Sequence, residues 1–209
     1  GFSIQLSQYY GAKDFENLRK SLAHSYRLTA FIAAGVLILS QSFASLVLTG
    51  LHTPSNIIGM SLLYLRIIFC GIPATAAYNM FASALRAMGN SKTPLTAMII
   101  ASVLNVSLDI LFVAGFGWGV AGAAIATVIA QSFSAVYCFL ILRRIDIVHL
   151  TRADFMPASG MNARLMKLGI PVVFQNIIIG VGGLVVQYVI NGYGFLFVVL
   201  QVRIFEYRR

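Results

Sequence analysis

Long apolar runs alternate with short polar segments along the 209-residue chain. A membrane-spanning helix needs about 20 mostly apolar residues. Five runs reach that length, namely residues 29–48, 57–84, 95–116, 120–142 and 169–190. Residues 1–10 resemble the end of one more span. Because barrel strands alternate over about ten residues, these uniform runs predict an all-α polytopic membrane protein with five full transmembrane helices and one partial helix.

The composition agrees with a chain surrounded mainly by lipid. Hydrophobic residues make up 59% of it and charged residues only 10%, whereas a soluble domain carries about 25% charged residues. The net charge of +9 does not indicate nucleic-acid binding, because the basic residues fall between the apolar runs and form no separate basic face.

The basic residues also predict an orientation. Eleven of the 15 Lys and Arg residues lie in segments 10–27, 86–94 and 143–167, while segments 49–56 and 117–119 hold none. The positive-inside rule places the basic segments in the cytoplasm. We therefore expect a multi-pass protein of the plasma or inner membrane.

Two local patterns predict details of the helices. Gly71-Ile72-Pro73 lies inside the second run, and proline removes a backbone donor there, so a kink or break is expected. Small residues recur on one stripe of the fourth run, where they allow close helix packing in lipid. This stripe consists of Gly119, Gly122, Ala126, Ala130 and Ser134.

Asp109 is the only acidic residue well inside a span, where a carboxylate costs about 2.5–3.5 kcal/mol on insertion scales. Asn105 lies one turn earlier on the same face. Thr127 lies a similar distance from the 117–119 turn on the next helix. Oxygen ligands at one depth suit a small hard cation, and a buried carboxylate can instead take a proton. The alternative is that all three residues only bond neighbouring groups.

Other polar residues inside spans have two interpretations each. Gln131, Gln175 and Asn176 either line a cavity or bond between helices. Arg66 either extends to the interface or faces a water-filled cavity and an anionic substrate. Since no nucleophile elbow, phosphate loop or metalloprotease motif is present, an enzyme is not expected. No cofactor is expected either, and no metal beyond Na⁺ at Asp109, Asn105 and Thr127.

Several segments, taken in order, resemble the MATE (multidrug and toxic compound extrusion) family. They are residues 8–12 (QYYGA), 84–94 (ALRAMGNSKTP), 105–112 (NVSLDILF), 117–127 (GWGVAGAAIAT) and 167–171 (KLGIP). The resemblance covers roughly residues 1–194. It implies two six-helix lobes around a cleft, with export driven by entry of Na⁺ or H⁺.

The resemblance also assigns parts of the chain. Residues 1–145 correspond to helices two to six of the first lobe, 146–168 to the cytoplasmic loop between lobes and 169–194 to the first helix of the second lobe. Residues 195–209 diverge, as a frameshifted end would. In several members an Asn and an Asp on the fifth helix and a Thr on the sixth bind a cation, and Asn105, Asp109 and Thr127 match these positions. No acidic residue matches the Glu that some members have on the seventh helix.

We therefore expect a fragment of a cation-coupled antiporter that exports organic cations in multidrug efflux. Its partners would be small-molecule organic cations and membrane lipids, with a monomeric full-length protein and no nucleic acid. Two alternatives remain. One is a lipid-linked oligosaccharide flippase of the same superfamily, and the other is a truncated membrane protein without transport activity.

Overall fold

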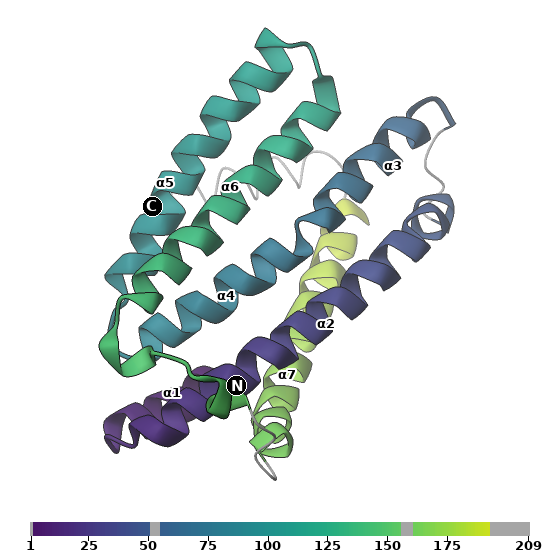
Figure 1. The fold of residues 1–209 in the computed structure, drawn as a ribbon. Helices are drawn as coiled ribbons and strands as arrows, with labels where there is room; N and C mark the ends of the chain where they lie inside the picture. Colours follow the sequence, from purple (N-terminus) through teal and green to yellow (C-terminus); the bar gives the residue numbers. More distant parts are fainter. Residues whose placement is uncertain (1, 51–54, 156–160, 193–209) are drawn as a thin grey trace, which may run out of the picture. The chain divides into compact units, whose positions relative to one another are not determined.

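A computed structural model describes residues 2–50, 55–155 and 161–192, all of them helical or in short connections. The expected divergent tail, 195–209, lies outside the described residues. The elements are α1 (Phe2–Gly11), α2 (Phe15–Gly50), α3 (Ser55–Cys70), α4 (Ile72–Ala87), α5 (Lys92–Asp109), the π-helix η1 (Ile110–Gly115), α6 (Gly119–Arg143), the 3₁₀ turns η2 (Asp146–Val148) and η3 (Arg152–Phe155), and α7 (Met161–Gly192) (Figure 1).

Four described helical stretches are long and apolar enough to cross a membrane. They are Phe15–Thr49, Ile57–Ala87, Lys92–Gly115 and Gly119–Arg143. These confirm four of the expected spans and make the chain a multi-pass helical membrane protein. The fifth expected span lies on α7, where the apolar stretch found among the described residues, Gly169–Gly183, is shorter. Phe2–Leu165 form one compact unit and the rest of α7 belongs to another, so α7 is described by itself.

The break expected in the second span is present at Gly71. Helix α3 ends at Cys70 and α4 begins at Ile72. Pro73 has no N–H to donate, and the Gly71 N–H bonds Ile68 O at 2.9 Å, three residues back instead of four. The two halves therefore cross the membrane as one interrupted helix.

Helix α2 begins much earlier than the apolar pattern predicted, at Phe15 rather than at residue 29. Asp14 caps it, because Asp14 Oδ1 accepts a hydrogen bond from the Asn17 N–H at 3.2 Å. Leu18 and Leu22 then bury one face of the added turns. The segment expected as a loop is thus mostly an amphipathic extension of the helix.

The buried core lies at one end of the helices, here called the basic end, where α2 and α5 begin and α4 and α6 end. Its members come from α1, α2, α4, α5, α6 and η2: Leu6, Leu18, Leu22, Met80, Ala84, Leu85, Ala97, Cys138, Leu142 and Val148. Elsewhere large apolar side chains point outward, as Phe31 does with 83% exposure. This pattern fits helices that are packed together at the basic end and face lipid along their length.

Helix α6 packs against α3, α4 and α5 through its small residues. Gly122, Ala126, Ala130 and Ser134 are all buried. A Cβ on Gly122 would lie 3.0 Å from Phe112 Cβ. The packing role predicted for this stripe is confirmed for these four residues, whereas Gly119 is exposed at the helix start.

Candidate functional site

The site is built on an antiparallel pair of helices, α5 and α6, that lie side by side (Figure 1). Gly117 and Gly119 form the connection with φ of 68° and 55°, a left-handed conformation that glycine adopts without strain. Phe112 and Trp118 stack with ring centroids 5.1 Å apart. This short connection brings the middle of α5 to the same depth as the middle of α6.

Asn105 and Thr127 meet across this pair of helices, as the sequence predicted. Asn105 Nδ2 donates to Thr127 Oγ1 at 3.4 Å, which is at the long end of the hydrogen-bond range. The Thr127 hydroxyl itself donates to Ala123 O at 3.0 Å within α6. The contact between the two side chains is therefore weak and open to exchange for another partner.

The same two residues line a mainly apolar cavity of about 330 Å³ between α4, α5 and α6. Gln131, one turn after Thr127 on α6, lines it too. The complete lining is Thr75, Tyr78, Asn79, Met98, Ala101, Ser102, Asn105, Thr127, Ala130, Gln131 and Ser134. Three of the residues expected at the site thus share one cavity.

Asp109 lies one turn beyond Asn105 and is not among the residues that line this cavity. It is the last residue of α5, directly before the π-helix η1, and π-helical segments are frequent at functional sites. Its Oδ1 is buried and has no hydrogen-bond partner within the described residues. An unpaired buried carboxylate oxygen is costly, and a bound cation or a proton would offset that cost.

Thr75 is a site residue that the sequence analysis missed. It lies on α4 one turn after the break at Gly71, and its hydroxyl has two acceptors within reach, Gln131 Oε1 and Gly71 O, the latter at 3.2 Å. Its position four residues after the glycine was the available signal. A polar residue one turn beyond a helix break can bond the freed backbone.

Of the remaining candidates, one is on α3 and two are on α7, in the other unit. Arg66 is exposed on α3 and does not line this cavity, in agreement with a side chain that extends toward the interface. Gln175 and Asn176 are exposed on α7, and Asn176 Nδ2 donates to Val172 O of its own helix at 2.9 Å. Helix α7 belongs to the other unit, so these two residues remain predictions.

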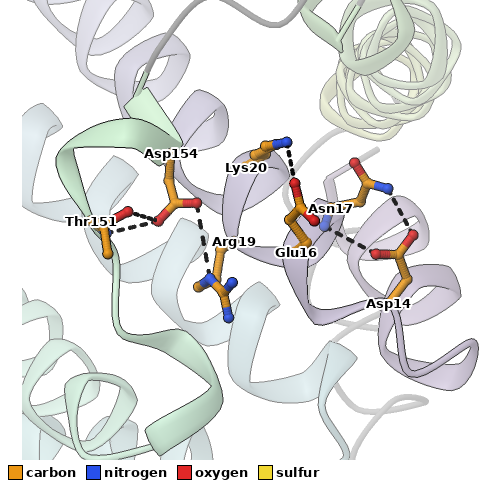
Figure 2. A network of polar contacts seen from close by, with 7 residues as sticks. All are labelled: Asp14, Glu16, Asn17, Arg19, Lys20, Thr151 and Asp154. Carbon is orange, nitrogen blue, oxygen red and sulfur yellow. Dashed lines mark hydrogen bonds and ion pairs between the residues drawn. The ribbon is translucent and has the colours of Figure 1, made fainter.

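At the basic end, the segment after α6 is attached to α2 through Asp154 (Figure 2). Asp154 Oδ2 accepts hydrogen bonds from the Thr151 N–H and hydroxyl at 2.7 and 2.8 Å, and Arg19 Nε lies 3.9 Å from Asp154 Oδ1. Burial alone would raise the pKa of Asp154, but the bonds from Thr151 and the charges of Arg19 and Lys20 lower it below its ordinary value. Residues 151–155, the described part of the expected inter-lobe loop nearest α2, are therefore anchored on that helix.

Comparison with known proteins identifies the family. The MatE family profile matches residues 1–111, more than half of the 209 residues. The chain belongs to the MATE family. The MATE resemblance based on the sequence motifs is thus confirmed.

Three curated relatives of this MATE chain are described as multidrug proteins. Probable multidrug resistance proteins YpnP and YoeA of Bacillus subtilis (strain 168) are 33% identical over 189 residues and 28% identical over 202 residues. Multidrug export protein MepA of Staphylococcus aureus (strain NCTC 8325 / PS 47) is 25% identical over 197 residues. The matches cover 90%, 93% and 93% of this chain but only 42%, 44% and 43% of the relatives. The chain spans less than half the length of these relatives.

Solved MATE structures have the same fold. The inward-facing conformation of a multidrug resistance MATE family transporter matches with a TM-score of 0.76 at 24% identity, over 82% of this chain and 39% of that one. The outward-facing conformation gives 0.75 at 24% identity, over 82% and 38%. Because the two scores are almost equal, the likeness is one of fold and not of a particular transport state.

Proposed function

We propose that this MATE chain takes part in cation-coupled efflux of organic cations, with Na⁺ or H⁺ bound at Asp109, Asn105 and Thr127. One observation carries the proposal. The buried Asp109 Oδ1, which has no hydrogen-bond partner among the residues that the structure describes, lies one helical turn from a weakly bonded Asn–Thr pair that lines the cavity. Residues one turn apart share a helix face, with about 5–6 Å between their Cβ atoms, so one small cation can contact Asp109 and Asn105 together.

The chemistry of this group favours a monovalent cation. Asp109 supplies one negative charge, while Asn105 and Thr127 supply neutral oxygens. A divalent ion bound by protein oxygens usually has more than one carboxylate. A proton on Asp109 is the alternative, because it also neutralises the buried charge. Either ion would make the neighbourhood of the cavity less negative and so weaken the binding of a cationic cargo.

The cavity is suited to a small organic cation. Its volume of about 330 Å³ is at the lower end of the range for small-molecule sites. Tyr78 and Met98 supply apolar surface, and Asn79, Ser102 and Gln131 supply polar groups. We further propose that α7 crosses the membrane as a fifth span and opens a second lobe.

Efflux from cells that express the whole gene encoding this chain tests the proposal. Ethidium export is measured under an imposed Na⁺ or H⁺ gradient, for the wild type and for Asp109→Asn. We expect Asp109→Asn to lower export at least about tenfold, and the gradient that drives the wild type identifies the ion. The matched control is Asp146→Asn, which neutralises a fully exposed carboxylate, at 101% side-chain exposure.

Two outcomes would contradict the proposal. Normal export by Asp109→Asn would make Asp109 a structural residue. Ethidium export that depends on neither gradient would exclude cation coupling. Loss of export by Asp146→Asn as well would mean that any change of charge harms the protein, so both variants are first compared for expression and thermal stability.

A further inference from the structure

The break between α3 and α4 is held by side chains from two other helices. On the α3 side, Gln41 of α2 donates from Nε2 to Arg66 O at 2.9 Å and to Cys70 Sγ at 3.3 Å. On the α4 side, Thr75 bonds Gln131 of α6. These side-chain bonds tie α3 to α2 and α4 to α6, although both halves also pack against both neighbours. Gly71 is the residue of the chain between the two halves.

Gly71 also lies directly against α6. A Cβ at this position would lie 3.0 Å from Val128 Cγ2 and 3.0 Å from Ile68 O, closer than most real Cβ contacts. Gly71 is buried, and the absence of a side chain lets the backbone of the break touch α6. Any change in the angle between α3 and α4 must therefore alter this contact with α6.

Thr75 has one hydroxyl proton and two acceptors within reach, Gly71 O at 3.2 Å and Gln131 Oε1. It can donate to only one of them at a time. Gly71 O already accepts the Thr75 N–H at 3.0 Å, so the bond to Gln131 is the one that joins α4 to α6. A ligand that takes Gln131 Oε1 would leave the Thr75 hydroxyl with Gly71 O alone.

Gln131 is in a position to meet such a ligand. It lines the same cavity as Asn105 and Thr127, and its amide oxygen attracts cations and hydrogen-bond donors. We propose that Gln131 is a positioning residue that transmits occupancy of this cavity to the break at Gly71. A cation that binds Gln131 releases Thr75, and the α3–α4 junction becomes free to change its angle, as hinges do at element ends. This proposal rests on the proposed function, because it needs a cationic ligand in the cavity.

Hydrogen–deuterium exchange of the backbone around residues 68–75 tests the proposal on the chain in lipid nanodiscs. The probe is tetraphenylphosphonium, and its binding is measured separately by equilibrium dialysis. In the wild type, we expect the probe to speed exchange at the break about tenfold, the factor that corresponds to losing one hydrogen bond.

Two variants should have the fast exchange without any probe and should show no further response to it. They are Thr75→Val, which removes the hydroxyl at nearly constant volume, and Gln131→Leu. Thr75→Ser should behave as the wild type because it keeps the hydroxyl. The matched control is Ser132→Ala, next to Gln131, since the Ser132 hydroxyl donates to Val128 O of its own helix at 2.7 Å.

The outcomes separate the two proposals. If the wild type does not bind the probe, the proposed function fails and this inference fails with it. If the probe binds but exchange at the break does not change, the inference is wrong and the proposed function stands. If Thr75→Val loses probe binding, Thr75 is itself a ligand contact and not a link to the break, which also overturns the inference.

Discussion

Asp154, buried on the segment after α6, lies 3.9 Å from Arg19 of α2, measured from Oδ1 to Nε. The pair is separated by more than 130 positions in the sequence. A second bond, from Arg27 Nη1 to Phe155 O at 3.0 Å, attaches the same segment further along α2. Together these two contacts hold residues 154 and 155 against α2 at the basic end.

Replacing Asp154 by Ala should destabilise the protein by about 2 kcal/mol, because Thr151 loses its charged acceptor and Arg19 its partner. Thermal unfolding in detergent, followed by circular dichroism, measures the change. The control is Glu16→Gln, which removes an exposed pair between Glu16 and Lys20 at 2.6 Å. The two residues lie one helical turn apart and their side chains are solvated, so loss of the pair should lower the free energy of unfolding by less than about 0.5 kcal/mol. Equal effects of the two variants would contradict a special role for Asp154.

The contribution of Asp154 to the stability of the folded protein should depend on pH. Its pKa in the folded protein lies below the ordinary 3.8, so the unfolded chain takes up a proton first as the pH falls. The stabilisation is therefore complete well above pH 3.8 and is lost as the pH falls through the lowered pKa. The stability difference between wild type and Asp154→Asn should be constant near neutral pH and shrink below pH 3.8.

Asp14 titrates in the same acidic range. Hydrogen bonds from Asn17 lower its pKa below 3.8, but Asp14 is present in both proteins and cancels from the difference. A difference between wild type and Asp154→Asn that stays constant down to pH 2 would contradict the assignment to Asp154.

The sequence predicted features whose cause is local. The break at Gly71 lies at a glycine and a proline two residues apart, where the proline removes a backbone donor from the helix. The meeting of Asn105 with Thr127 follows from a connection so short that the two helices must be antiparallel neighbours. Both predictions needed only neighbouring residues, and both are confirmed by the structure.

The features that were missed depend on contacts between distant residues. The early start of α2 requires Leu18 and Leu22 to be covered by Leu6, Ala84 and Val148, which come from other elements. The anchoring of Asp154 depends on Arg19, which lies far from it in the sequence. The bond from Thr75 to Gln131 joins α4 to α6 across 56 positions, and no periodicity within one helix reveals it.

Gly122 should tolerate no side chain. A Cβ there would lie 3.0 Å from Phe112 Cβ and 3.1 Å from Trp118 Cβ, so Gly122→Ala must push the α5–α6 connection apart at a cost of about 1–3 kcal/mol. The control is Gly35→Ala in α2, where a Cβ would have nothing within 4 Å. Alanine is the better helix former by about 1 kcal/mol, so this variant should be as stable as the wild type or more stable. Thermal unfolding of both variants measures the contrast, and a stable Gly122→Ala would contradict the close packing.

Thr127 should contribute directly to cation affinity if Na⁺ is the coupling ion. Thr127→Val keeps the volume but removes the hydroxyl that accepts the Asn105 amide at 3.4 Å. Losing one oxygen ligand should weaken Na⁺ binding about tenfold, or about 1.4 kcal/mol, measured as Na⁺-dependent thermal stabilisation. Ser107→Ala is the control, because Ser107 is exposed and its hydroxyl donates to Val103 O of α5 itself at 2.9 Å. If Asp109→Asn abolishes the Na⁺ effect while Thr127→Val leaves it intact, Asp109 binds the ion with ligands other than Thr127. If neither variant alters it, the Na⁺ acts elsewhere on the chain.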